Sequence, residues 1–291
     1  MGVLSGINTK MRGSVGKYTF KQLKGQTIVS EKVDKKSIPV RTPAQMRQRM
    51  AWDNIIAIWR SFTGNMRPSF ESKLRTRSDY NEFMSANIAG NRIYLTKSVA
   101  LQGGAVVAPY QVTRGSLPTI EVTIGADQVP VTSIAMGGIT IGASTTLRTF
   151  SQAILENNPD WNQGDQLSIF WLKQSATTEG VPLVTTECKE ITIDALDDGT
   201  LLGDLVDANL LAVVDGKLGM GGTVNGGVAF VHSRKTVGKT RVSTQRIVCN
   251  NPLMPQYTSE AAYENAVNSY GGFNQDYFLT PNETTDMNAQ P

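Results

Sequence analysis

The stretch RTPAQMRQRMAWDNIIAIWRSF, residues Arg41–Phe62, carries the clearest structural signal in this chain. Thr42 fits the N-cap of a helix, Pro43 fits the first helical position, and Gln45 completes a capping box three residues after Thr42. Behind this start, apolar side chains recur at the spacing of one buried helical face. The sequence therefore predicts a helix over residues 42–62, with an inward face made of Ala51, Ile55, Ile58, Trp59 and Phe62.

The predicted helix is apolar on more than one side. Trp52 and Ile56 widen the apolar stripe beyond the width that one contact surface needs. We therefore expect the helix to pack on its own β region and also against a second copy of the protein. The alternative interpretation is an ordinary amphipathic core helix.

Composition sets the broad class. The chain has 291 residues, of which 40% are hydrophobic and 18% are charged, and this length suits one large or two modest domains. Two cysteines, Cys188 and Cys249, make neither a disulfide framework nor a zinc site. No apolar run is long enough to span a bilayer, so we expect no membrane partner.

Charge is divided unevenly along the chain. Residues 1–100 contain 18 Lys and Arg against 6 Asp and Glu, whereas residues 101–291 contain 10 against 19. Such polarity favours a basic surface that meets an acidic partner, either nucleic acid or the acidic half of a neighbouring copy. A head-to-tail contact between unlike surfaces builds rings or filaments. A solvated basic surface without a partner remains the third interpretation.

Residues 1–41 have the character of a basic N-terminal arm. Residues 17–20 and 26–33 have strand character, and Tyr18 and Phe20 alternate with polar residues. The arm fits either a hairpin that grips a phosphate backbone or a strand that adds to the sheet edge of a neighbouring subunit, and we favour the second. Its basic residues include Lys10, Arg12, Lys17, Lys21 and Lys24.

The remainder of the chain divides into three further segments. Residues 42–104 are predicted to be helical, with later helices that begin at Ser78 and Thr96. Residues 105–257 are predicted to form an antiparallel immunoglobulin-like β-sandwich with one short inserted helix, capped by Ser144, so the fold class is α+β. The predicted strands cover residues 106–112, 119–124, 133–141, 167–173, 184–193, 228–233 and 241–249, and residues 201–214 fit either a strand or a helix.

Residues 258–291 have their own pattern. Thr258 fits the cap of a short helix over residues 259–270, which Gly271 and Gly272 end. The extended tail that follows is polar and cannot bury enough surface to fold alone. Its aromatic residues suit either a disordered segment or one laid across a neighbour; they are Phe273, Tyr277 and Phe278.

The sequence contains no catalytic, cofactor or metal signature. His232 is the only histidine, which excludes paired-histidine metal motifs, and no G-x-S-x-G elbow is present. We interpret His232 as a hydrogen-bonded residue at a sheet edge. An acidic run is interpreted as a solvated edge or as a docking surface for a basic arm; it comprises Asp194, Asp197, Asp198, Asp204 and Asp207.

Particular phrases of the sequence resemble known proteins. GSVGKYTFKQLKGQTIV, TPAQMRQRMAWDNIIAIWRSF and SRKTVGKTRVSTQRIV are similar to uncharacterised proteins of Bacteroidota and their phages, including the group called domain of unknown function 6266. APYQVTRGSLP and NRIYLTKSVALQGG are similar to structural proteins of crAss-like phages. The resemblance implies a phage setting, in which a β-sandwich protein with arms is commonly a virion component.

We therefore expect a structural phage virion protein, made in the bacterial host cytoplasm, that assembles with itself and with tail or neck-ring or capsid neighbours. The alternative is a nucleic-acid-binding protein that uses the basic arm on phosphates. The partner-binding residues expected on either ground are Lys10, Arg12, Lys17, Tyr18, Phe20, Lys21, Lys24, Arg47, Trp52, Ile56, Trp59, Phe273, Tyr277 and Phe278.

Overall fold

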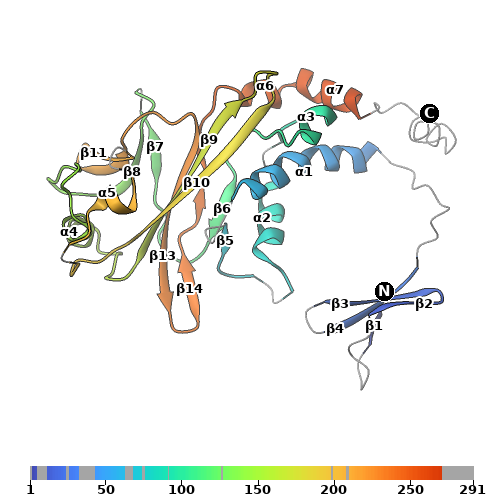
Figure 1. Cartoon of the computed structure of the whole chain (residues 1–291), viewed down its shortest axis with the longest axis horizontal. Coiled ribbons are helices and arrows are strands. Elements are labelled where there is room, and N and C mark those ends of the chain that lie inside the picture. Colours follow the sequence, from blue (N-terminus) through green and yellow to red (C-terminus); the bar gives the residue numbers. More distant parts are fainter. Residues whose placement is uncertain are drawn as a thin grey trace. The chain divides into compact units, whose positions relative to one another are not determined.

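The structure of the protein is a computed structural model. Its chain divides into two compact units, Met1–Pro43 with Phe273–Pro291, and Ala44–Gly272, which we call the body. The fold is mixed α+β with mostly antiparallel sheets and few helices, so the predicted fold class is confirmed at this level (Figure 1). The structure describes residues 2–4, 12–23, 26–32, 43–62, 68–73, 76–90, 92–125, 127–197, 199–207 and 210–270.

The first unit contains a four-stranded antiparallel sheet in the order β1-β4-β3-β2. β2 and β3 are joined through Gly16, whose φ of +56° favours glycine in this tight turn. The predicted strand character is confirmed, but the strands pair with one another, so an extended arm is not confirmed. The strands are β1 (Gly2–Leu4), β2 (Gly13–Val15), β3 (Tyr18–Leu23) and β4 (Gln26–Glu31).

The helix predicted over residues 42–62 is α1 (Pro43–Ser61). Ile55, Ile58 and Phe62 are all at most 1% exposed, which confirms the predicted inward face at these positions. Ser78 and Thr96 accept hydrogen bonds as the predicted N-caps of the next two helices. The further helices are α2 (Asp79–Asn87), α3 (Lys97–Leu101), α4 (Leu147–Asn157), α5 (Leu202–Leu205), α6 (Met254–Thr258) and α7 (Glu260–Ser269).

Two predicted caps were wrong by one or two residues. Thr146, not Ser144, caps α4. The helix does not begin at Thr145, because Thr145 belongs to the preceding turn, where its hydroxyl accepts a hydrogen bond from the main-chain N–H of Gly142. Ser259, not Thr258, caps α7, because α6 already occupies the chain through Thr258. Neighbouring hydroxyl residues offer equivalent capping groups, so the sequence cannot choose between them.

The body contains a central five-stranded sheet in the order β10-β9-β13-β14, with β16 paired to β13. A second, four-stranded sheet has the order β11-β12-β8-β7, and a third joins β15, β6 and β5. Every pairing is antiparallel except β5 with β6. The strands are β5 (Ser69–Phe70), β6 (Gln111–Arg114), β7 (Val122–Ile124), β8 (Pro130–Ala135), β9 (Gln166–Ala176), β10 (Pro182–Thr192), β11 (Leu211–Val214), β12 (Lys217–Met220), β13 (Gly226–Thr236), β14 (Lys239–Val242), β15 (Gln245–Arg246) and β16 (Val248–Asn250).

Several strand predictions need correction. The strand predicted over residues 133–141 is β8, which begins at Pro130 and already ends at Ala135. The single strand predicted over residues 241–249 is three short strands, β14, β15 and β16. The last correction has a clear cause, because these three short strands pair with different partners and turn between them. The undecided segment 201–214 contains both a helix, α5, and a strand, β11.

Strands β9 and β13 are buried on both faces. Along β13, Val228 and Phe230 face a core shared with α4 and β8, whereas Ala229 and Val231 face a core shared with α1 and α2. Such alternation follows from the two-residue period of a strand. The predicted helical segment and the β region therefore share one core, in which Phe62, directly after α1, packs edge-on against Phe170 of β9 with ring centroids 5.7 Å apart.

Residues 105–110 form a buried extended segment rather than the start of the strand predicted over 106–112. Amide side chains take the place of neighbouring strands along it. Asn54 of α1 accepts from the Val106 N–H at 2.7 Å and donates to the Val106 carbonyl at 2.9 Å. Gln174 of β9 accepts from the Val107 N–H at 2.9 Å and donates to the Ala105 carbonyl at 3.1 Å.

We predict that Asn54→Ala lowers the free energy of unfolding by about 3 kcal/mol or more, because it leaves buried polar groups of Val106 and Tyr110 without partners. Urea denaturation measures this change. Asn81→Ala, at an exposed position of α2, is the matched control and should change stability by less than about 0.5 kcal/mol. Equal stability losses in the two variants would mean that Asn54 does not hold this segment.

Candidate functional site

The structure describes some of the predicted partner-binding residues and not others. Tyr18, Phe20 and Lys21 lie in the N-terminal sheet, Lys17 lies in the turn between β2 and β3, and Arg12 directly precedes β2. The side chain of Arg47, on α1, lies outside the described part of the structure. Five of the predicted residues lie wholly outside the described residues: Lys10, Lys24, Phe273, Tyr277 and Phe278.

Strand register sorts the N-terminal sheet into two faces. Val15 pairs with Tyr18, and Phe20 pairs with Val29, so these four residues lie on one side of the sheet, which we call the apolar face. Val15 is 65% exposed and Tyr18 is 56% exposed. The sheet thus presents apolar side chains that its own strands do not cover.

The opposite side of the N-terminal sheet is mainly polar, although Ile28, which pairs with Lys21, also lies on it. Ser14, Thr19 and Lys21 lie on it, because each is one residue out of phase with the apolar face. Lys17 lies in the turn between β2 and β3, and Arg12 directly precedes β2. The structure therefore separates the predicted partner residues: Tyr18 and Phe20 share the apolar face, while the cations lie on the turn, the flank and the other side.

The predicted residues of α1 pack inside the body. Trp52, Ile56 and Trp59 are half-buried against the core that α1 shares with α2. The Trp59 ring lies 5.4 Å from the rings of both Tyr80 and Phe83. Contact with a second copy through these side chains remains a prediction.

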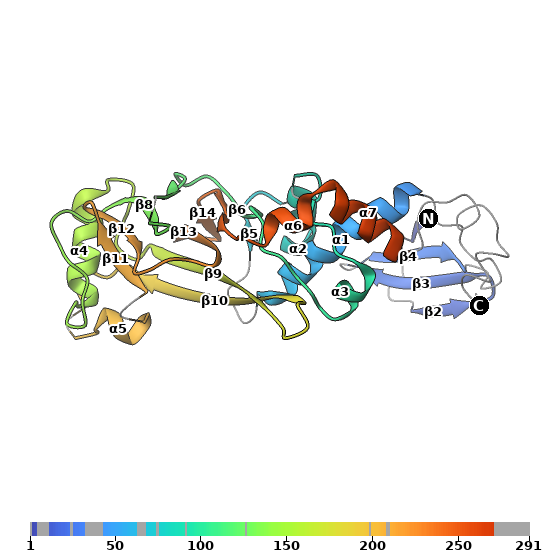
Figure 2. The ribbon, with the colours of Figure 1, turned by 90° about the horizontal axis from the view of Figure 1, so that it is seen from above.

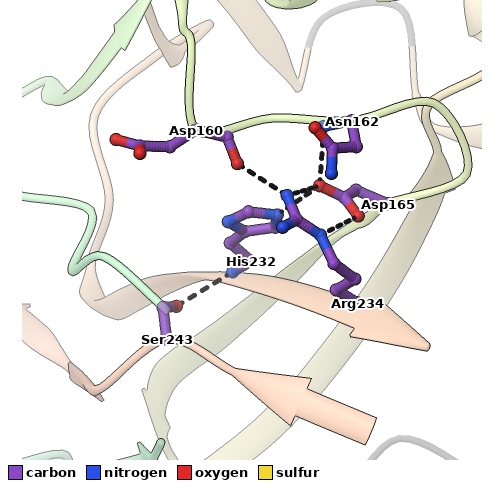
Figure 3. A network of polar contacts seen from close by, with 6 residues as sticks. All are labelled: Asp160, Asn162, Asp165, His232, Arg234 and Ser243. Carbon is purple, nitrogen blue, oxygen red and sulfur yellow. Dashed lines mark hydrogen bonds and ion pairs between the residues drawn. The ribbon is translucent and has the colours of Figure 1, made fainter. Parts of the chain in front are cut away.

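A network of polar contacts in the body surrounds His232 (Figure 3). The Nε2 atom of His232 lies 2.7 Å from the Asp165 carboxylate, and Arg234 donates to both oxygens of that carboxylate at 2.8 and 2.7 Å. The main-chain N–H of Asn162 donates to the same carboxylate at 2.8 Å. The His232 ring also stacks on Trp161, with ring centroids 3.9 Å apart.

His232 was predicted to lie at a sheet edge, and this was wrong. β13 has β9 on one side at this point, and on the other Ser243 bonds to both the N–H and the carbonyl of His232. His232 and Asp165 are each 1% exposed. Because Asp165 precedes His232 by 67 residues, no local pattern could have indicated their pairing.

Burial and hydrogen bonding set the charges in this network. Burial lowers the pKa of His232, and the bond to Asp165 offsets this only in part, so the ring favours its neutral form. Burial alone would raise the pKa of Asp165, but hydrogen bonds from Arg234, Asn162 and His232 outweigh it and lower the pKa. The result is an ionised Asp165 paired with Arg234 beside a neutral imidazole.

The network ties the loop before β9 to the middle of β13. Arg234 also donates to the main-chain carbonyl of Asp160 at 2.7 Å. Ser243, the nearest hydroxyl drawn in Figure 3, accepts from the main-chain N–H of His232 and not from its ring. A cleft of about 140 Å³ beside Trp161 and His232 is smaller than the clefts that hold drug-sized ligands. The geometry therefore supports a structural role, in which the network holds the loop before β9 against β13, rather than the activation of a nucleophile.

The thiols and acids offer no further reactive centre among the described residues. Burial raises the pKa of Cys188 to about 11 and that of Cys249 to about 12, so both thiols are protonated at neutral pH. Both cysteines are half-buried on strands. Within the described ranges, no group of three or more His, Cys, Asp or Glu residues is placed to hold a metal ion.

No protein-family model, curated protein or solved structure matches this chain. The resemblance to proteins of Bacteroidota and their phages therefore stays a prediction from the sequence. None of the helices described here has both the length and the apolar character needed to cross a membrane.

We predict that the protein loses stability as pH falls below about 6.5. The pKa of His232 is lower in the folded chain than in the unfolded chain, so the unfolded chain binds a proton first and is stabilised by it. This contribution is complete above pH 6.5. The lowered pKa of Asp165 adds a second loss only in stronger acid, as pH falls through its folded value. Thermal melts between pH 8 and pH 5 measure the first loss.

His232→Phe keeps a ring against Trp161 but cannot titrate, and His232 is the only histidine. The variant should lose about 2 kcal/mol at pH 7.5, through the missing hydrogen bond to a charged group. Its melting temperature should also lose the pH dependence between 6.5 and 5. If the variant keeps the wild-type slope, other groups take up the proton.

Proposed function

We propose that this protein is a structural phage virion protein that assembles with itself and with neighbouring tail, neck-ring or capsid proteins, without catalysing a reaction. The exposed apolar face of the N-terminal sheet carries this proposal. Among residues 12–22 and 26–32, whose side chains the structure describes, Thr27 is the only one that is buried. A small sheet that buries so few of these side chains does not by itself offset the entropy of ordering its chain, so in this proposal a partner covers it.

The body supplies the rigid part of this proposed component. Strands β9 and β13 are buried on both faces, and the His232 network fastens β13 to the loop before β9. The immunoglobulin-like sandwich expected from the sequence belongs to the same proposal. It would consist of the central sheet and the β11-β12-β8-β7 sheet, which enclose a core that contains Phe150 and Phe230.

The setting of the proposal comes from the sequence resemblance. The chain has one rigid body and one sheet with exposed apolar side chains. This combination fits a phage protein that is made in the bacterial host cytoplasm and incorporated into the virion. We favour a tail or neck ring over a capsid-surface role, because oppositely charged halves suit a repeating head-to-tail contact.

A nucleic-acid-binding protein is the second candidate. In residues 1–43, Lys and Arg outnumber Asp and Glu nine to two. Arg12, Lys17, Lys21 and Lys32 are all exposed, as phosphate contacts must be. Binding through such contacts weakens with salt by about 0.9 log unit per contact for each log unit of salt concentration.

We predict that Tyr18→Asp prevents self-association, because it places a charge on the apolar face. Sedimentation velocity over a concentration series measures the association constant, which should fall at least about tenfold. Thr19→Asp is the matched control, since it adds the same charge one residue away on the polar side of the sheet. Equal effects of the two variants would mean that charge alone, and not the apolar face, governs association.

The nucleic-acid candidate is tested in a separate assay. Fluorescence anisotropy with a labelled DNA duplex at several salt concentrations gives the number of phosphate contacts. If this candidate is correct, Lys17→Gln with Lys21→Gln reduces the salt slope by about two contacts, whereas Tyr18→Asp leaves most of it. If the virion proposal is correct, the lysine variants still associate and DNA affinity stays at the nonspecific level.

A further inference from the structure

Among the described residues, six large apolar side chains are exposed; four of them fall in two places, whereas Leu101 and Val237 are single exposed residues elsewhere. Val15 and Tyr18 lie on the apolar face of the N-terminal sheet. Leu196 is 76% exposed and Leu201 is 38% exposed, and both lie on the loop between β10 and α5. We call Leu196 and Leu201, with the carboxylates of Asp194, Asp197 and Asp204, the leucine corner.

The fold itself holds the leucine corner in place. Leu201 forms a β-bridge with Thr146 at the start of α4. Arg148 of α4 donates to the main-chain carbonyl of Leu196 at 3.3 Å, and the N–H of Leu196 donates to Asp194 at 2.9 Å. The leucines are therefore displayed to solvent by a loop that is fastened to α4.

Charge at the leucine corner is complementary to that of the N-terminal sheet. Asp194 and Asp204 accept hydrogen bonds from the main-chain N–H groups of Leu196 and Leu201, and Asp197 directly follows Leu196. Arg148 is a nearby cation. Main-chain N–H groups of Thr200 and Gly199 donate to Asp197 and lower its pKa, so this carboxylate stays ionised. The described N-terminal sheet region carries four exposed cations against Glu31: Arg12, Lys17, Lys21 and Lys32.

We propose that the apolar face of the N-terminal sheet in one copy docks on the leucine corner of a second copy of this chain. This inference rests on the proposed function, because it names the partner surface for the same sheet. Val15, Tyr18, Phe20 and Val29 would cover Leu196 and Leu201, while cations at the sheet's flank meet the surrounding carboxylates. Apolar contact supplies the affinity, and charge orients the two surfaces.

The two surfaces consist of different residues, so the contact between them is heterologous. Within the body, α1 and α7 lie at one end, and α4 and α5, which flank the leucine corner in sequence, lie at the other (Figures 1 and 2). A contact between different surfaces repeats from copy to copy. It closes into a ring where the rotation permits and otherwise continues as a filament.

The size of the sheet sets the expected strength of one contact. Two strands of six residues and two of three residues cover roughly 300 Å². Stable pairs bury about 800 Å² on each partner, so a single contact is weak. Assembly should therefore depend on protein concentration and on salt, and ring closure should strengthen it.

The first test compares Leu196→Asp with Leu101→Asp, since Leu101 is 79% exposed and lies on α3, at the other end of the body. Both variants place a charge at a solvent-exposed leucine and should fold, which circular dichroism checks. We expect Leu196→Asp to lower the association constant at least about tenfold and Leu101→Asp to leave it unchanged. Unchanged association of Leu196→Asp, or loss in Leu101→Asp alone, overturns the inference while self-assembly stands.

The second test maps the contact directly. Tyr18 is replaced by the photoreactive residue benzoylphenylalanine, and equal amounts of ¹⁴N- and ¹⁵N-labelled full-length chain are mixed before irradiation. Mixed-isotope crosslinks to residues 194–204 support the inference. Mixed-isotope crosslinks to another surface, including the N-terminal sheet of the second copy, overturn the inference but keep the proposed assembly. Crosslinks within one chain, or a monomer at every concentration, overturn both.

Discussion

The structure of the body depends on the hydrogen bonds made to the buried main chain of residues 105–110. Buried N–H and carbonyl groups need partners, and no adjacent strand supplies them along most of this segment. Asn54 of α1 and Gln174 of β9 supply them instead, and Asn251, after β16, donates to the Val107 carbonyl at 3.0 Å. Asn87, the last residue of α2, does the same for Gln111, where β6 begins. Four amide side chains from separate elements thus fix α1, α2 and the central sheet around one strip of chain.

This arrangement explains why the sequence predicted α1 well and residues 105–110 poorly. The start and inward face of α1 are local signals, because a cap and a helical spacing are read within a few residues. Asn54, by contrast, breaks the apolar stripe of α1 and resembles a surface residue until Val106 is placed beside it. Strand order and the division of residues 241–249 into three strands also depend on distant partners, which periodicity does not contain.

The candidate surfaces were also predicted well where the signal is local and poorly where it depends on distant residues. The alternation of Tyr18 and Phe20 predicted a half-covered strand, and register confirms that both residues share one side of a sheet. The pairing of Asp165 with His232 joins positions 67 residues apart, so the lone histidine gave no sign of its partner. The acidic run was predicted as a solvated edge or a docking surface, but the exposure of Leu196 within it depends on the fastening of its loop to α4.

The two units differ in how they cover their apolar side chains, which is the basis of the proposed assembly. Both faces of β9 and β13 are covered inside the body, which leaves a few exposed apolar side chains there, including Leu196. The N-terminal sheet has the opposite character, since it exposes apolar side chains and buries little. Two such sheets would also match each other in shape, yet their contact would bring like cations together, and like charges across an interface disfavour a partner. In the proposed assembly, charge would therefore direct the sheet away from a second N-terminal sheet and toward an acidic surface, so that the contact repeats from copy to copy.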